Sequence, residues 1–424
     1  MAVDLQREEA LREQDKRRIA LKRAKELRTR ISGYLENKTK IPNGFEVQDD
    51  YQKAKNDIMN LLDASETDWE NWHWQMANRI RDTKKLSQLI SLSPEQQEAV
   101  ERVGKQYRWA VSPYYMALAI TGGMDGAVWL QAIPSEEEIK DRHGLEDPMG
   151  EEFTSPAPGI TRRYPDRLII NVTNQCAMYC RHCQRRRNIG EIDRHKPVKV
   201  LQEALRYIKA NKEIRDVLIT GGDALLLSDK QIDWLLTELD NIPHVEIKRI
   251  GTRTPVTMPQ RITKELCSIL AKHPPIYINT QFNHPLEVTP EAKQACDRLI
   301  SAGIVLGNQA VLLRNVNNQP DVMKKLNQSL LTIRVRPYYL FHAKAVKGTH
   351  HFITGVDEGI AIMEQLRGYT SGLAVPTYII NAPNGYGKTP ILPQYVLENK
   401  NHHVTLRTWE KRIIPYHIGG KHSK

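Results

Sequence analysis

Long apolar runs are missing from this sequence. No stretch approaches the roughly 18 consecutive apolar residues that a membrane-spanning helix needs. The N-terminal stretch MAVDLQREEALREQDKRR also lacks the apolar core of a signal peptide. We therefore expect a cytoplasmic protein with no membrane partner.

Cysteine is scarce as well, with five in 424 residues. Cys176, Cys180 and Cys183 lie in one short segment, and a cytosolic protein keeps its thiols reduced. A metal site is therefore favoured over disulfides for this group. Cys267 and Cys296 lie in segments with helical spacing, where we expect them to be small buried apolar residues.

Acidic residues are outnumbered by basic ones, and the formal charge is +11. Nucleic acid, a small-molecule site that holds several anions, and a solvated basic face are all compatible with this excess. Apolar residues (40%) and charged residues (26%) otherwise have the proportions of a globular protein, so a large core is expected.

The pattern changes along the chain and predicts four segments. Residues 1–45 carry a helix of mixed charge, interpreted as an exposed oligomerisation arm. Residues 46–160 form a helical domain. Residues 161–390 alternate β-branched runs with amphipathic stretches, which indicates parallel strands joined by right-handed crossovers. Residues 391–424 form a short C-terminal segment.

The β-branched runs predict an α/β fold, a partial barrel of the (β/α)6 type. In such barrels the chemistry lies on loops at the C-terminal ends of the strands. The residues that follow each run are therefore the candidate site. The runs are RLIINVT (167–173), DVLIT (216–220), VEIKRIGTR (245–253), IYINTQF (276–282), VLGNQAVLL (305–313), IRVRPYYLF (333–341) and VPTYIIN (375–381).

The cysteine triplet directly follows the first of these runs. Its sequence is Cys176-Ala-Met-Tyr-Cys180-Arg-His-Cys183. A structural zinc site usually takes four ligands in two closely spaced pairs, and no second pair repeats the pattern. Three thiolates on a [4Fe–4S] cube leave one iron open to chelate a substrate or cofactor. Spacing and strand context favour this cluster over zinc or a redox-active cysteine group.

Paired glycines follow the second run, in Thr220-Gly221-Gly222-Asp223. Glycine at a strand end allows the backbone to come close to a ligand. A Gly-Gly turn alone is weak evidence for a binding site. Its position directly after a predicted barrel strand is what favours a role in ligand binding.

A glycine-flanked lysine follows the last run, in the segment NAPNGYGKT. A phosphate-binding P-loop would need glycine where Ala382 stands and a helix where Pro390 follows, so this reading is poor. Lys388 on a glycine-rich turn at a barrel mouth instead suits an imine with an aldehyde cofactor.

Together these features resemble the lysine 2,3-aminomutase family of the radical S-adenosylmethionine (SAM) superfamily. The resemblance covers about residues 72–399. It implies a radical SAM barrel with a [4Fe–4S] cluster, SAM on the open iron, pyridoxal 5′-phosphate (PLP) and an external one-electron reductant. The implied activity is that of an isomerase which moves an amino group between adjacent carbons of an amino acid. The matching blocks are ITRRYPDRLIINVTNQCAMYCRHCQRRR, VLITGGDALLLSD, IGTRTPV, FNHPLEVT, LGNQAVLLR, IRVRPYYL and NAPNGYGKTP.

The resemblance also implies roles for individual residues. Lys388 would be the catalytic residue and would form the imine with PLP, and Arg185 would bind the substrate α-carboxylate. The cluster ligands would be Cys176, Cys180 and Cys183. Further cofactor contacts would come from Arg163, Tyr164 and Arg167 (PLP), His182 (adenine), Gly221, Gly222 and Asp223 (the methionine part of SAM), and Gln309.

The substrate is predicted from two departures from the family pattern. Lys344 and Asn381 stand where the lysine enzymes use two aspartates to bind the far ammonium group. An ammonium facing Lys344 would be repelled, at a cost of roughly several kcal/mol in a dry site. A carboxylate would be attracted and could accept from the Asn381 amide. The long lysine side chain favours L-glutamate, converted to β-glutamate (3-aminoglutarate).

Other departures and alternatives remain. No cysteine follows Cys296, so the C-terminal zinc site of lysine-type enzymes is expected to be absent. Gln281 stands where those enzymes usually have histidine. Lys344 argues against lysine as the substrate but leaves aspartate or another amino acid open.

Two readings outside this chemistry also remain. A radical SAM enzyme that modifies RNA or protein would not need Lys388, and a non-enzymatic nucleic-acid-binding protein would hold no labile sulfide. We do not expect a nucleic-acid partner, and the helical N-terminus favours a homo-oligomer, either a dimer or a tetramer.

Overall fold

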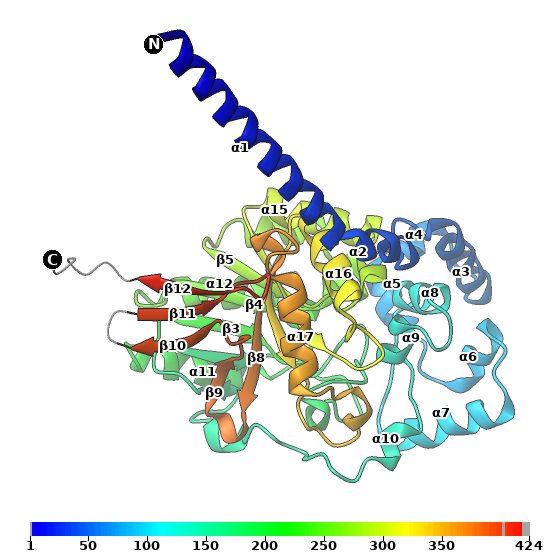
Figure 1. Ribbon diagram of the computed structural model, residues 1–424. Coiled ribbons are helices and arrows are strands. Elements are labelled where there is room, and N and C mark those ends of the chain that lie inside the picture. Colours follow the sequence, from blue (N-terminus) through cyan, green and yellow to red (C-terminus); the bar gives the residue numbers. More distant parts are fainter. Residues whose placement is uncertain (1, 401–402, 418–424) are drawn as a thin grey trace. The chain divides into compact units, whose positions relative to one another are not determined.

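The computed structural model (Figure 1) describes residues 2–400 and 403–417. The chain divides into two compact units, Met1–Pro42 and Asn43–Lys424. The first unit consists of α1 (Ala2–Arg30), α2 (Ser32–Asn37) and a short 3₁₀ turn. The side chains of α1 from residue 12 onward are mostly exposed, so this helix buries little apolar surface within its own unit.

The second unit begins with a group of short helices. Ser65 and Ser93 cap α4 and α7 with capping boxes, and Pro94 and Pro113 occupy first-turn positions where no backbone donor is needed. Nearly every side chain of α8 is buried, as expected for a helix that is apolar all round. The helices are α3 (Gln48–Leu61), α4 (Glu66–Trp69), α5 (Trp72–Ala77), α6 (Thr83–Leu89), α7 (Pro94–Gln106), α8 (Pro113–Thr121), α9 (Ala127–Ala132) and α10 (Glu137–Lys140).

A nine-stranded sheet follows, with its strands in sequence order from β1 to β9. Strands β2 to β8 are parallel, and β1 and β9 pair antiparallel at the two edges. The strands are β1 (Ile160–Thr161), β2 (Arg167–Asn171), β3 (Asp216–Thr220), β4 (Ile247–Gly251), β5 (Ile276–Thr280), β6 (Val305–Leu312), β7 (Arg336–His342), β8 (Thr377–Ala382) and β9 (Gly387–Pro390).

Helices connect successive parallel strands, and six strand–helix units precede β8. This confirms the predicted α/β partial barrel, and each predicted run overlaps one of the parallel strands. The small helix α13 (Thr254–Thr257) follows β4. The crossover helices are α11 (Val198–Ala210), α12 (Asp229–Asp240), α14 (Lys264–Leu270), α15 (Pro290–Ser301), α16 (Pro320–Thr332) and α17 (Val356–Leu366).

Alternation along the strands separates the core from the cavity side. In β2 and β4 every second residue is buried, and the main hydrophobic core contains Leu168, Ile170 and Ile250. Arg167 and Arg249, which face the opposite way, are only half-buried and line a cavity. Cys267 and Cys296 belong to the core, as expected from their helical segments.

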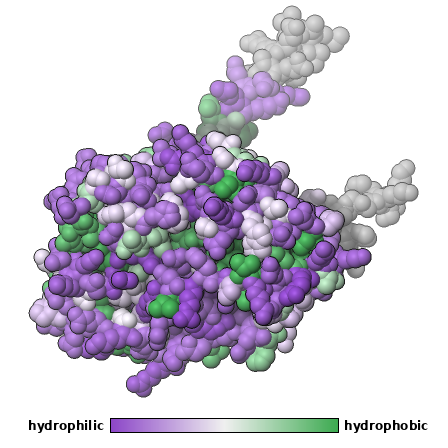
Figure 2. Space-filling view, turned by 180° about the vertical axis from the view of Figure 1, so that it is seen from behind, coloured by the Kyte–Doolittle hydropathy of each residue, from purple (hydrophilic) through white to green (hydrophobic). Residues whose placement is uncertain are grey.

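The C-terminal part adds a small antiparallel sheet that the sequence analysis did not predict. It consists of β10 (Val396–Lys400), β11 (His403–Arg407) and β12 (Ile413–His417) (Figure 1). The opposite face of the molecule shows mainly hydrophilic residues with small separate apolar patches (Figure 2). None of the helices in the described part of the chain combines the length and apolar character that crossing a bilayer requires.

A buried carboxylate ties the helical part to the cysteine loop. Glu138 on α10 is fully buried and forms ion pairs with Arg181, at 2.6 Å, and with Arg186. Burial alone would raise the pKa of Glu138, but the two guanidinium groups outweigh it and lower the pKa below the usual 4.5. This carboxylate is therefore ionised in the folded protein and neutralises two buried cations.

The Glu138→Gln variant should lose about 3–5 kcal/mol of unfolding free energy, because both arginines would keep their charge without a counterion. Denaturant unfolding followed by circular dichroism measures this. Because the pKa is lowered, the contribution is complete above pH 4.5 and disappears as the pH falls through the lowered value. The control is Glu136→Gln, a more exposed neighbour, with a change within about 0.5 kcal/mol. Equal effects of the two variants would contradict this assignment.

Candidate active site

A cavity of about 320 Å³ lies at the carboxyl ends of the parallel strands. Every site residue predicted from the sequence lines it, although these residues come from segments up to 225 positions apart (388 − 163). They are Arg163, Tyr164, Arg167, Cys176, Cys180, His182, Cys183, Arg185, Gly221, Gly222, Asp223, Gln309, Lys344, Asn381 and Lys388.

The three cysteines lie in the loop after β2 and are free thiols. All three reach the cavity wall, and Arg253 donates a hydrogen bond of 2.8 Å from Nη1 to Cys180 Sγ. Three thiol donors on one loop, facing open space, fit a [4Fe–4S] cluster with one iron free for another ligand.

The paired glycines bring two loops of the chain together. A Cβ on Gly221 would lie 2.4 Å from the carbonyl oxygen of Thr173, and one on Gly222 would lie 2.4 Å from that of Gln175. The Gly222 and Asp223 amides donate to those same oxygens, at 2.5 and 2.7 Å. The close approach seen here is between the β3 loop and the segment that leads into the cysteines, and the approach to a ligand stays a prediction.

Gly222→Ala should push this segment away from the β3 loop. We expect a loss of about 1–3 kcal/mol in unfolding free energy, as for other overpacked sites, together with a lower iron content after reconstitution. Iron and sulfide assays with denaturant unfolding test both effects. Gly372→Ala, where nothing lies within 4 Å of the added atom, is the matched control. Full iron loading of Gly222→Ala would contradict the expectation.

Asp223 also joins loops at the strand ends. Its carboxylate is buried and accepts from Thr252 Oγ1 at 2.5 Å and from the Arg253 amide at 2.7 Å. Burial raises its pKa, and these hydrogen bonds act in the opposite direction. The observed partners of Asp223 are thus protein groups, in the β4 loop and in the turn that follows Asp223 itself.

His182 presents one unpartnered nitrogen. The amides of Gln281 and Asn283 lie 3.2 and 3.4 Å from its Nε2, and Nδ1 has no partner. Burial, followed by the charges of Arg253 and Arg186, lowers the pKa well below 6.5, so the ring is neutral. If the two amides donate to Nε2, Nδ1 carries the proton and is available to a ligand. Gln281, the departure from the family pattern, therefore contacts the ring next to Cys183.

Lys388 lies on strand β9, one residue beyond the glycine-rich turn where the sequence analysis placed it. Its cross-strand partner is Asn381 on β8. The Lys388 amide donates to Tyr164 Oη at 3.0 Å, which joins the last strand to the segment before β2. Burial, with the charges of Arg249 and Arg167, lowers the pKa of Lys388 to about 8. A substantial fraction of the amine is therefore neutral near physiological pH, as a nucleophile must be.

Cationic side chains surround Lys388. The Arg167 guanidinium lies 3.9 Å from the Tyr164 ring centroid, and Arg249 pairs with Asp216 at 2.7 Å. Arg163 has a buried Nε without a hydrogen-bond partner. These groups fit the phosphate of PLP, because that anion would meet fixed cations beside the lysine amine.

The predicted substrate side of the cavity is also cationic. Lys344 Nζ donates to Gln184 Oε1. Burial, followed by the charges of Arg185 and Arg163, lowers the pKa of Lys344 to about 7. The Asn381 amide nitrogen is buried and has no partner. A bound carboxylate would satisfy both groups and would raise the pKa of Lys344.

Glu151 contacts two arginines of the candidate site and was not predicted from the sequence. This buried loop carboxylate forms ion pairs with Arg163, Arg185 and Arg187, at 3.1, 3.0 and 3.1 Å. The three guanidinium groups outweigh burial and lower its pKa. The Glu151 carboxylate thus partly neutralises Arg185 and restrains its position. No motif in the sequence marks Glu151, whereas Arg249 and Asn279 could have been found from strand alternation.

Comparison with known proteins gives the family. Residues 170–325 match the model of the radical SAM superfamily, and residues 363–421 match that of lysine-2,3-aminomutase. Glutamate 2,3-aminomutase of Clostridioides difficile is 55% identical over 94% of this chain and 94% of its own length. The chain belongs to the lysine 2,3-aminomutase family of radical SAM enzymes.

Other members of the family are more distant but also extensive. The L-lysine 2,3-aminomutases of Fusobacterium nucleatum and Clostridium subterminale are 48% and 47% identical. These matches cover 83% and 84% of this chain and 83% and 85% of the relatives. The aminomutase is therefore an isomerase, and the family implies a [4Fe–4S] cluster and SAM, for which the three-cysteine loop fits.

Proposed function

We propose that this aminomutase converts L-glutamate to β-glutamate with PLP as its second cofactor. The observation that carries the proposal is the pair Lys344 and Asn381. Both line the cavity, and no described carboxylate forms an ion pair with Lys344. The relative with 55% identity is a glutamate 2,3-aminomutase, which supports the same substrate.

The proposed substrate fits the charges of the cavity. Arg185 would bind the α-carboxylate, and Lys344 with the Asn381 amide would bind the side-chain carboxylate. A substrate ammonium at Lys344 would instead be repelled by this lysine and by Arg185 and Arg163, whose charges already lower the pKa of Lys344. Charge complementarity on both sides therefore selects an amino acid with two carboxylates.

The cofactors supply chemistry that side chains cannot provide. When bound, the cluster and SAM supply radical chemistry, and PLP supplies the conjugated system that lets the amino nitrogen migrate. Lys388 would hold PLP, and Arg163, Tyr164 and Arg167 would orient it. His182, Gly221, Gly222, Asp223 and Gln309 would surround SAM and the neighbouring cofactor. The residues themselves mainly bind, orient and exclude water.

Several broader predictions belong to this proposal. The division at residues 45, 160 and 390, the homo-oligomer, the cytoplasmic location and the zinc-free C-terminal segment stay predictions. A low-potential one-electron reductant is required as a partner, because radical SAM chemistry begins with reduction of the cluster.

Product analysis tests the proposal directly. Anaerobic reconstituted protein receives reductant, SAM and PLP, with L-glutamate, L-aspartate and L-lysine in separate reactions. We expect β-glutamate from glutamate and no product from lysine. Turnover of lysine would show that the interpretation of Lys344 is wrong, and turnover of aspartate alone would give a shorter acidic substrate. SAM cleavage without any product would favour a macromolecular substrate.

A further inference from the structure

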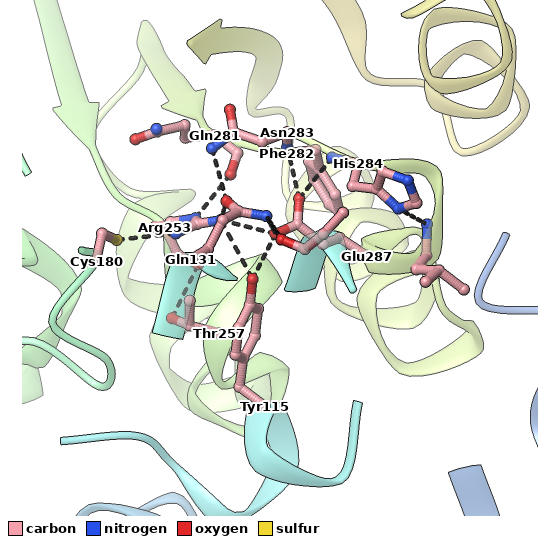
Figure 3. A network of polar contacts seen from close by, with 12 residues as sticks. Tyr115, Gln131, Cys180, Arg253, Thr257, Gln281, Phe282, Asn283, His284 and Glu287 are labelled. Carbon is pink, nitrogen blue, oxygen red and sulfur yellow. Dashed lines mark hydrogen bonds and ion pairs between the residues drawn. The ribbon is translucent and has the colours of Figure 1, made fainter. Parts of the chain in front are cut away.

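A buried arginine contacts one of the cluster cysteines. Arg253 follows β4 in the sequence GTRTP and is 8% exposed. Its Nη1 donates to Cys180 Sγ at 2.8 Å, and Figure 3 shows the guanidinium between this sulfur and a group of buried polar side chains.

The guanidinium is fixed on its other sides. Nη2 donates to Gln131 Oε1 at 2.6 Å and to Glu287 Oε1 at 2.7 Å, and Nε donates to the Gln281 carbonyl at 3.0 Å (Figure 3). Partners from α9 and from the segment between β5 and α15 therefore leave Nη1 directed at the sulfur.

Glu287 is itself held in place. It is fully buried and accepts from Tyr115 Oη at 2.6 Å and from the Asn283 amide at 2.5 Å. The carboxylate that pairs with Arg253 is thus itself fixed in position. Rigid placement matters because a donor that could turn away would contribute little to the charge at the sulfur.

The contact has a redox consequence once a cluster is bound. Reduction adds one electron, and part of the added negative charge lies on the cysteine sulfurs. A cationic donor at a ligand sulfur therefore stabilises the reduced form more than the oxidised form, and hydrogen bonds to sulfur are among the factors that set cluster potentials. We propose that Arg253 is a positioning residue that raises the reduction potential of the cluster through Cys180. This inference holds for any amino acid substrate.

The reduction potential of the reconstituted cluster tests the proposal without turnover. The protein is titrated anaerobically with dithionite and mediators in the absence of SAM and amino acid, and the reduced cluster is measured by EPR. Each sample is normalised to its iron and labile sulfide. Arg253→Lys should lower the potential. At the wild-type midpoint, the reduced-to-oxidised ratio should fall about tenfold, equivalent to about 59 mV for one electron.

Two further variants separate tuning from structure. Arg261→Lys changes another buried arginine, which donates to Asp229 and to the Leu225 and Leu227 carbonyls and not to Cys176, Cys180 or Cys183, and it should leave the potential unchanged. Arg253→Gln combined with Glu287→Gln removes the guanidinium without leaving a buried carboxylate unpaired, and it should also lower the potential. An unchanged potential in both Arg253 variants would overturn the proposal. So would folded Arg253 variants that take up no cluster, because Arg253 would then only hold the loop.

Discussion

Lys388→Ala should form β-glutamate at less than about one thousandth of the wild-type rate, as when a group that acts covalently is removed. The amine lies in the cavity and is proposed to hold PLP. The variant should also lose the visible absorbance of lysine-bound PLP. Cleavage of SAM by reductant alone should persist, because the cysteine loop follows β2, whereas Lys388 lies on β9 at the other end of the strand order.

The pH dependence of PLP uptake provides an independent test of Lys388. Its pKa is lowered to about 8, so the nucleophilic neutral amine dominates above pH 8 and is lost as the pH falls. The rate of uptake should therefore rise with a midpoint near 8, well below that of an ordinary lysine. Lys400→Ala, on an exposed side chain, is the control and should behave as wild type. Retained PLP absorbance in Lys388→Ala would contradict the assignment.

Lys344→Asp should lower kcat/KM for L-glutamate by at least about a hundredfold. The substitution replaces attraction of the substrate carboxylate by repulsion, and losing one partner of a buried charge pair costs about 2–5 kcal/mol. A tenfold change in rate corresponds to about 1.4 kcal/mol. Product formation is followed anaerobically across a range of glutamate concentrations. Combining Lys344→Asp with Asn381→Asp should then permit turnover of L-lysine.

The matched control makes the same charge change on the same loop. Lys347 does not line the cavity, and its exposed side chain forms an ion pair with Glu146. Lys347→Asp should leave kcat/KM for glutamate within about twofold, as expected for a surface substitution. Comparable losses in the Lys344 and Lys347 variants would indicate a general electrostatic effect and would contradict a substrate contact at Lys344.

Local features of this chain are the ones that its sequence predicts best. The run DVLIT coincides with β3, and the cysteine triplet follows β2 as expected. A short β-branched run carries its own strand signal, and loops after parallel strands necessarily gather at one edge of the sheet. These two facts suffice to bring Cys176 and Lys388 to one cavity.

Features that depend on distant partners could not be predicted in this way. Glu138 and Glu151 carry no motif, because their importance comes from arginines within and after the cysteine triplet, which approach them only in the folded chain. The C-terminal sheet was missed because its strands are largely exposed and contain charged residues, so the alternation of buried and exposed positions is weak. Gly221 and Gly222 stand out in the sequence, but their packing against residues 173–175 is visible only in the fold.

The β8–β9 hairpin has a consequence for how this family can diversify. It carries Asn381 and Lys388 as cross-strand partners, while the cysteine loop belongs to the other end of the strand order. Selection on the hairpin and on Lys344 can therefore exchange one amino acid for another while the parts that generate the radical stay under separate constraint. A few point substitutions in the hairpin and at Lys344 would then be enough to change the substrate, while the rest of the enzyme stays the same.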